Sequence, residues 1–262
     1  MCAPVFTSGE LGETHWRCGP VDGVTLGSTS RLVDVEHRAE LHLLHGRLQR
    51  GPGYGAAPQS TRQILARVGA MLKLREIGRY HVHAAGVLAP DGRAWLLTGA
   101  SGCGKSTLTY ALARHGWRVL GDDGVVLEQC SSGAVAHAWR EALHVSIELA
   151  AWFPELRKYQ PFVDWQDNRH RVAVEAAYAR RATVAGVIVL ERGTTDRLSP
   201  LAHTAALVAL IRQSTFLLVT DTHSSANLAM LRAMVESVPC FSLQHSPEQL
   251  QRIPATIVEA IA

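Results

Sequence analysis

Residues 99–106 read Gly99-Ala100-Ser101-Gly102-Cys103-Gly104-Lys105-Ser106 and match the pattern G-x-x-x-x-G-K-[ST] at every fixed position. A glycine loop at a helix N-terminus directs several backbone N–H groups at one set of phosphate oxygens. Gly99 permits the sharp turn, and Gly104 lets the backbone approach the phosphates. Lys105 supplies a cation for the β- and γ-phosphates, and the Ser106 hydroxyl is a ligand for Mg²⁺. The pattern therefore predicts a site for ATP and Mg²⁺.

The flanking sequence has the strand–loop–helix order that this motif requires. Residues 94–98 form an apolar run that predicts a buried strand leading into the loop. Residues 105–115 have helical spacing, and Gly116 is placed to end that helix. A glycine-rich turn without function is the alternative, but it does not require this order. We expect Thr107, in the first helical turn, to complete the ATP-binding set.

Two adjacent carboxylates, Asp122 and Asp123, follow the next predicted strand, residues 117–120. The carboxyl ends of strands line the nucleotide crevice in α/β sheets. A phosphate loop needs a carboxylate near its serine to hold Mg²⁺, and a second acid can accept a proton from an incoming hydroxyl. A solvated turn is the alternative, because Asp and Gly favour turns. The position after the strand favours the functional interpretation.

Two basic clusters are weaker candidates. His81-Val82-His83 has the alternation that places both imidazoles on one face of an extended chain, and His83 lies in the predicted strand of residues 82–88. Arg169, His170 and Arg171 begin a later short strand, and an arginine can stabilise a phosphoryl group during transfer. Spacing alone leaves a surface pair or a solvated basic cluster as the alternative for both.

Composition narrows the class of protein. The chain has 262 residues and a formal net charge of +3, with no run of Lys or Arg, so a nucleic-acid surface is not indicated. Five cysteines without C-x-x-C spacing favour a reduced, cytoplasmic setting. No stretch of about 20 apolar residues suggests a membrane span. The 13 histidines show no metal-ligand spacing, so a metal-binding protein ranks last.

The chain divides at the breaker cluster Gly51-Pro52-Gly53-Tyr54-Gly55. Residues 1–55 alternate in short apolar segments and predict a small β-rich region. Residues 56–262 predict the nucleotide-binding domain. Its expected elements are helices at 59–76, 201–213, 224–237 and 247–261, a hairpin at 125–139, strands at 184–190 and 240–243, and an irregular segment at 150–170.

The order of these features resembles HPr kinase/phosphorylase and the HPr-kinase-like enzymes of peptide-modifying gene clusters. The resemblance rests on His83, on Trp95-Leu96-Leu97-Thr98-Gly99 leading into the loop, and on the segment His115-Gly116-Trp117-Arg118-Val119-Leu120-Gly121-Asp122-Asp123. It implies an α/β fold of the HPr-kinase/phosphoenolpyruvate-carboxykinase-like type. That fold has a P-loop kinase core, a mixed β-sheet and flanking helices.

The resemblance also implies roles for individual residues. Asp122 corresponds to the catalytic base, and Asp123 corresponds to a metal ligand together with Ser106. Lys105 corresponds to the phosphate-binding lysine, and His83 to the active-site histidine near the transferred phosphate. Arg171 corresponds to a basic residue of a later strand.

The chain is shorter than full HPr kinases. In this it resembles the shorter branch of the family, the serine kinases associated with lasso-peptide biosynthesis. This branch implies transfer of the γ-phosphate of ATP to a Ser or Thr hydroxyl of a peptide or small protein. The family also implies a homo-oligomer. A small-molecule kinase acting on free serine or a sugar would use the same residues. A regulatory ATPase without an acceptor is a further alternative. We expect neither a nucleic acid nor a membrane as partner.

Overall fold

The computed structural model describes residues 5–8, 13–163, 170–194, 196–217 and 222–246, together with Ile253 and Ile257. The chain forms two compact units. The first contains residues 1–81 and 214–229, and the second contains residues 82–213 and 230–262. Strand β7 (Arg79–Val82) and helix α4 (Thr222–Ser237) each contribute residues to both units.

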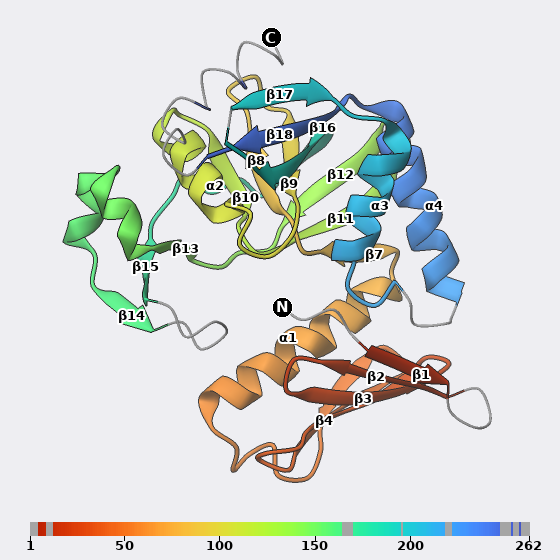
Figure 1. Ribbon diagram of the computed structural model, residues 1–262. Helices are drawn as coiled ribbons and strands as arrows, with labels where there is room; N and C mark the ends of the chain where they lie inside the picture. Colours follow the sequence, from red (N-terminus) through yellow and green to blue (C-terminus); the bar gives the residue numbers. More distant parts are fainter. Residues whose placement is uncertain are drawn as a thin grey trace. The chain divides into compact units, whose positions relative to one another are not determined.

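The first unit contains a six-stranded antiparallel meander (Figure 1). Its strands are β1 (Val5–Ser8), β2 (Thr14–Cys18), β3 (Val21–Leu26), β4 (Thr29–Asp34), β5 (Ala39–Leu44) and β6 (Arg47–Arg50). Alternate side chains are buried in β3 and β5, as expected for a sheet with one covered face. The prediction of a β-rich N-terminal region is confirmed.

Helix α1 (Gln59–Arg75) covers the meander. Leu65, Val68 and Leu72 recur at helical spacing and are at most 4% exposed. The helix packs against β4, β5 and β6, so its apolar stripe is buried on the sheet. For this reason the first unit extends beyond residue 55, where the sequence predicted a boundary.

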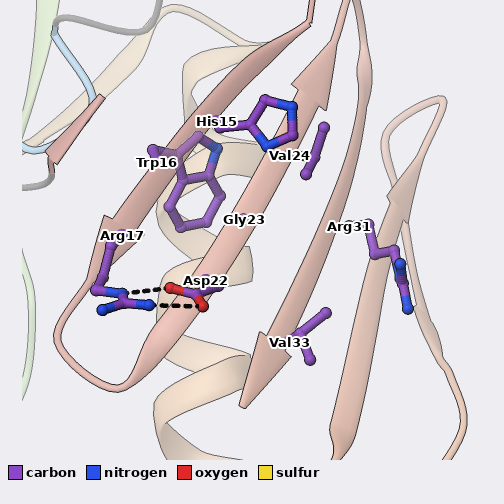
Figure 2. A pocket seen from close by; sticks show the side chains of 8 residues that line it. All are labelled: His15, Trp16, Arg17, Asp22, Gly23, Val24, Arg31 and Val33. Atoms are coloured by element: carbon purple, nitrogen blue, oxygen red, sulfur yellow. Dashed lines mark hydrogen bonds and ion pairs between the residues drawn. The ribbon is translucent and has the colours of Figure 1, made fainter. Parts of the chain in front are cut away.

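The outer face of the meander carries a shallow hollow of about 390 Å³ (Figure 2). Its charged side chains are paired across strands. Arg17 makes two hydrogen bonds to Asp22, and Arg31 pairs with Glu40 of the next strand. These pairs lower the pKa of Asp22 and of Glu40, through hydrogen bonds from the guanidinium groups in each case. Each arginine that lines the hollow is therefore already paired with a carboxylate.

The second unit is built on a mixed sheet. Its strands lie in the order β10 (Arg118–Gly121), β8 (Ala85–Leu88), β9 (Ala94–Thr98), β16 (Arg181–Arg192), β12 (Gly133–Ala138) and β11 (Val125–Cys130). Strands β9 and β18 (Cys240–His245) both run parallel to β16, and β17 (Arg197–Pro200) pairs antiparallel with β18. The prediction of an α/β chain with a mixed sheet is confirmed.

Helix α2 (Lys105–Arg114) buries Leu108 and Leu112 in one core with Trp95 and Leu97 of β9. These two β9 residues alternate with Leu96, which faces the opposite side of the sheet. Helix α3 (His203–Gln213) packs against β9, β16 and β18. Figure 1 shows α2 and α3 flanking these strands. The strand and helix on either side of the glycine loop are therefore fixed by the same core.

The predicted irregular segment at 150–170 contains short regular elements. Two 3₁₀ helices, Ile147–Ala151 and Pro154–Lys158, pack on a small sheet of β13 (Leu143–Ser146), β15 (His170–Val174) and β14 (Pro161–Val163). The apolar side chains Leu149, Phe153 and Leu156 fill this core. Phe153 is 1% exposed and therefore belongs to the packing of this segment.

One expectation about secondary structure needs correction, and another lies mostly outside the described residues. The predicted strand 82–88 is interrupted, because β7 ends at Val82 and β8 begins at Ala85. His83 between them donates its backbone N–H to the Gln213 carbonyl rather than to a strand. Arg169 and most of the predicted helix 247–261 lie outside the described residues. Within the described part of the chain, no helix has the length and apolar character needed to cross a bilayer.

Candidate functional site

The strand directions bring three chain segments to one end of the sheet. Strand β8 runs antiparallel to β9 on one side and to β10 on the other. Ala85 at the start of β8 pairs with Leu97 near the end of β9, and Gly86 pairs with Gly121 at the end of β10. Three segments therefore meet at the same end of the sheet: the glycine loop after β9, the acid pair after β10 and the histidine before β8.

The glycine loop has a backbone that only glycine adopts easily. Gly99 has φ of +145°, and a Cβ there would lie 2.6 Å from the Leu190 carbonyl oxygen. Gly104 has φ of +100° at the N-cap of α2. The first turn of α2 contains no acidic residue, and its first amides have no partner within the helix. This end of the helix is electropositive and suited to an anion.

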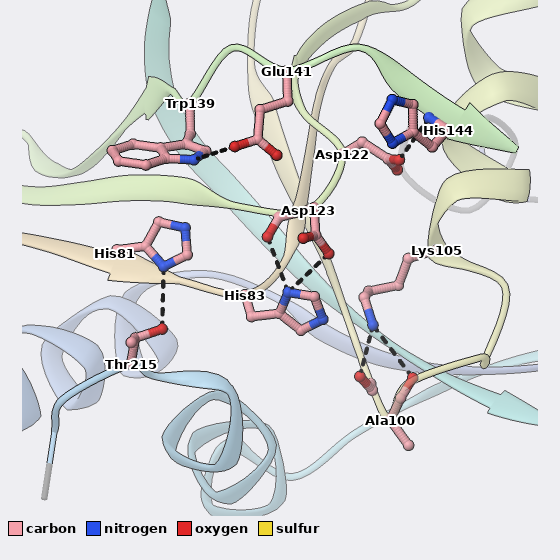
Figure 3. A network of polar contacts seen from close by, with 11 residues as sticks. His81, His83, Ala100, Lys105, Asp122, Asp123, Trp139, Glu141, His144 and Thr215 are labelled. Atoms are coloured by element: carbon pink, nitrogen blue, oxygen red, sulfur yellow. Dashed lines mark hydrogen bonds and ion pairs between the residues drawn. The ribbon is translucent and has the colours of Figure 1, made fainter. Parts of the chain in front are cut away.

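Lys105 extends over the loop that precedes it (Figure 3). Its ammonium lies 3.0 Å from the carbonyl oxygen of Gly99 and 3.3 Å from that of Ala100. The residue is 7% exposed. Neutral carbonyl groups do not balance its charge, so an anion entering the loop would find a partly desolvated cation in place.

Asp122 is buried beside the start of α2. Burial raises the pKa of its carboxyl to about 7, and the charge of Asp123 adds to this. Three contacts oppose the shift: a hydrogen bond with the Ser106 side chain, a hydrogen bond from the backbone amide of His144, and the positive charge of Lys105. The His144 amide nitrogen lies 3.3 Å from Oδ2 of Asp122. Its Oδ1 is also buried and has no hydrogen-bond partner among the residues that the structure describes.

His83 faces the second acid. Its Nδ1 lies 2.9 Å from the backbone carbonyl oxygen of Asp123 and 3.1 Å from the carboxylate Oδ1 of the same residue. A carbonyl oxygen only accepts, so Nδ1 carries the hydrogen, and in the neutral ring Nε2 is the basic nitrogen. The Asp123 side chain is 32% exposed and the His83 side chain 11%. Asp123 is therefore accessible, whereas Asp122 is buried and His83 is nearly so.

The two acids therefore occupy different environments. The sequence-based expectation placed Asp123 with Ser106 at the metal and made Asp122 the base. In the structure, the hydrogen bond of Ser106 and the charge of Lys105 both lower the pKa of Asp122. His83 instead contacts Asp123. Both acids follow Gly121, the last residue of β10, and lie in a bend of the chain.

A divalent cation fits the environment of Asp122. Oδ1 of this buried carboxylate has no hydrogen-bond partner in the described part of the chain, and a serine hydroxyl lies beside the carboxylate. Mg²⁺ accepts such oxygen ligands. In the described residues, no group of three or more His, Cys, Asp or Glu side chains converges on a point. Such a sparse set suits a cation that takes one or two protein ligands and completes its shell with phosphate and water.

Other predicted residues have simpler placements. Cys103 is 5% exposed, and burial raises the pKa of its thiol, which fits a small packing residue rather than a nucleophile. Ser101 and Gly102 lie exposed in the loop, and Thr107 lies partly buried in the first turn of α2. His81 belongs to the first unit, where its Nδ1 lies 3.2 Å from Thr215 Oγ1 (Figure 3). Arg171 lies on β15, opposite Ser146 and Phe162.

Three contacts at this site were not predicted from the sequence. The amide of His144 reaches Asp122, and the side chains of Arg192 and His245 reach the glycine loop. Arg192 and His245 end two strands that run parallel to each other. The rule that strand ends line the crevice could have indicated both. No sequence pattern marks a backbone amide such as that of His144.

Comparisons with known proteins add one similarity. No family model matches the chain, and no curated protein matches it. Among solved structures, the chain is similar to the HPr(Ser) kinase/phosphatase from Coxiella burnetii. The sequences are 13% identical and the TM-score is 0.36, over 69% of this chain and 94% of that chain. At this identity and TM-score, the similarity assigns neither an activity nor a substrate to the chain.

Proposed function

We propose that this chain is a kinase that uses ATP and Mg²⁺ to phosphorylate a Ser or Thr hydroxyl of a peptide or small protein. One observation carries the proposal. A glycine loop with a buried lysine, a buried acid beside the loop serine, and a histidine paired with a partly exposed acid lie at one end of the sheet. These are the parts that phosphoryl transfer requires: a phosphate cradle, a cation site and a proton acceptor.

The phosphate cradle would consist of the amides of residues 99–104, Lys105 and the first turn of α2 with Thr107. In this structure the Lys105 ammonium is held by the Gly99 and Ala100 carbonyl oxygens. A triphosphate would replace these neutral acceptors by charged ones, which form stronger hydrogen bonds. Binding therefore favours a shift of the lysine from the loop carbonyls to the phosphates.

Ser106 and Asp122 would hold Mg²⁺. When bound, the cation neutralises phosphate charge and favours the ionised form of Asp122. His83 and Asp123 would receive the proton of the acceptor hydroxyl. The contact with Asp123 orients the His83 ring, and in the neutral ring it makes Nε2 the basic nitrogen. These roles for the two acids are the reverse of those that the family resemblance implies.

The direct test is transfer of label from γ-labelled ATP, with Mg²⁺ present and absent. Serine-containing peptides, free serine and a sugar would compete as acceptors in one assay. Labelled peptide supports the proposal, and labelled serine or sugar supports the small-molecule kinase. Free phosphate without any labelled acceptor supports the regulatory ATPase. The Lys105→Ala variant should abolish transfer, whereas the exposed Lys73→Ala variant should retain it.

A further inference from the structure

The glycine loop is held from outside by two residues on neighbouring strands. Arg192 of β16 and His245 of β18 are register partners in the parallel pair. Arg192 Nε donates to the carbonyl oxygen of Gly102 at 2.9 Å, and His245 Nε2 lies 2.6 Å from that of Cys103. The carbonyl can only accept, so His245 Nε2 carries the hydrogen. Two adjacent strand residues therefore bind two consecutive loop carbonyls.

The contact of His245 fixes the direction of the next amide. A trans peptide is planar, so its C=O and N–H point to opposite sides. With the Cys103 carbonyl directed at His245, the N–H of Gly104 is directed away from it. The imidazole also lies against Gly104, where a Cβ would come within 2.8 Å of Cε1. His245 is 1% exposed, so packing restricts the movement of its ring.

We propose that Arg192 and His245 are positioning residues for phosphate binding. This inference rests on the proposed function, in which the loop holds the phosphates of ATP. A glycine-rich loop is flexible, and an inverted peptide would turn a carbonyl dipole toward the phosphates. The two anchors keep the carbonyls of Gly102 and Cys103 outward, so the loop binds phosphate without first having to be ordered.

His245→Leu and His245→Gln separate the hydrogen bond from packing. Leucine keeps an apolar side chain of comparable size but has no donor, whereas the glutamine amide can replace the Nε2–H donor. His115→Leu is the matched control. That histidine contacts the Ala111 carbonyl at 2.8 Å, at the far end of α2. Thermal unfolding of each variant, compared with the unchanged protein, reports any general loss of structure.

The measured quantity is the affinity for Mg²⁺–ATP and for inorganic tripolyphosphate, by calorimetry. We expect His245→Leu to weaken both by about tenfold, the usual effect of one hydrogen bond. His245→Gln and His115→Leu should stay within about twofold of the unchanged protein. Unchanged affinity in the leucine variant, equal loss in the glutamine variant, or loss for ATP alone would overturn the proposal.

The role of Arg192 is tested by comparing its single variant with the double variant that also changes His245. Arg192→Met should weaken the affinity for Mg²⁺–ATP by itself. The double variant with His245→Leu should lose less than the product of the two single losses, because both residues restrain one loop. Losses that multiply would show that the two anchors act independently and would contradict a shared role.

A second readout does not depend on nucleotide. Hydrogen exchange of the amides at residues 102–105 should be faster in His245→Leu and near normal in His245→Gln. If the unchanged protein bound neither ATP nor tripolyphosphate, the proposed function would fail, and with it the phosphate role of the anchors. The exchange data would still decide whether His245 orders the loop, and unchanged exchange would refute this too.

Discussion

His83 and Asp123 are joined twice, because Nδ1 of the imidazole lies 2.9 Å from the backbone carbonyl oxygen and 3.1 Å from the carboxylate of the same residue. The carbonyl fixes the tautomer of the neutral ring, and the two contacts together fix the orientation of the ring. A histidine held in this way has the orientation that a proton acceptor requires. The pair is also more exposed than Asp122, as an incoming hydroxyl would need.

Replacement of the Asp123 carboxylate should slow transfer without weakening nucleotide binding. In Asp123→Asn the backbone carbonyl still orients His83, but the negative charge beside the ring is lost. We expect kcat to fall by about 10²- to 10⁴-fold, the usual contribution of acid–base catalysis. Single-turnover transfer and ATP titration measure the two quantities separately. Asp91→Asn, in an exposed turn, is the control, and normal kcat in Asp123→Asn would remove the pair from the mechanism.

Replacement of Asp122 should change the response to metal. In Asp122→Asn the cation loses its carboxylate ligand, so Mg²⁺ should no longer increase the affinity for ATP. Affinity measured with chelator present should change little. If Asp123→Asn abolished the Mg²⁺ effect and Asp122→Asn left it intact, the acid roles implied by the family resemblance would hold instead.

The buried Asp122 should also make the stability of the metal-free protein depend on pH. Its pKa is raised from 3.8 in the reference state to about 7 in the fold. Between these values the folded protein keeps a proton that the unfolded chain has released. Stability from this group is therefore present at low pH and is lost as the pH rises toward 7, by about 1.4 kcal/mol per pH unit.

The Asp122→Asn variant isolates this contribution, because other groups titrate over the same range. Urea unfolding at pH 5, 6, 7 and 8 gives the difference between the variant and the unchanged protein. The variant should become relatively more stable as the pH rises to about 7, and the difference should then level off. A difference independent of pH would show that Asp122 is ionised in the fold at all of these values.

Gly104 and Gly116 allow a matched test of the loop. Both have positive φ, of +100° and +84°, so alanine at either position should destabilise by about 1 kcal/mol. A Cβ at Gly116 meets none of the described residues within 4 Å, whereas one at Gly104 meets the ring of His245. Thermal unfolding should show a larger loss in Gly104→Ala. Equal losses in both variants would mean that His245 moves aside freely.

The motif, the strand before it, the helix after it and the acid pair were all predictable from sequence. Local patterns encode them, since an apolar run, a glycine loop and helical spacing each span fewer than about 20 residues. The bounds of β9 at residues 94–98 agree with the predicted strand. The hairpin of β11 and β12 was also predicted, because a glycine turn separates two apolar segments.

Tertiary structure alone decided which acid faces Ser106 and which faces His83. Both are aspartates in adjacent positions, so composition and spacing treat them alike. The strand directions around β8 and the break after Val82 set their surroundings. The same applies to Arg192 and His245, which are far from the loop in sequence. Local sequence determines the elements, whereas pairing between distant strands determines which side chains share a site, because that pairing depends on the packing of the whole sheet.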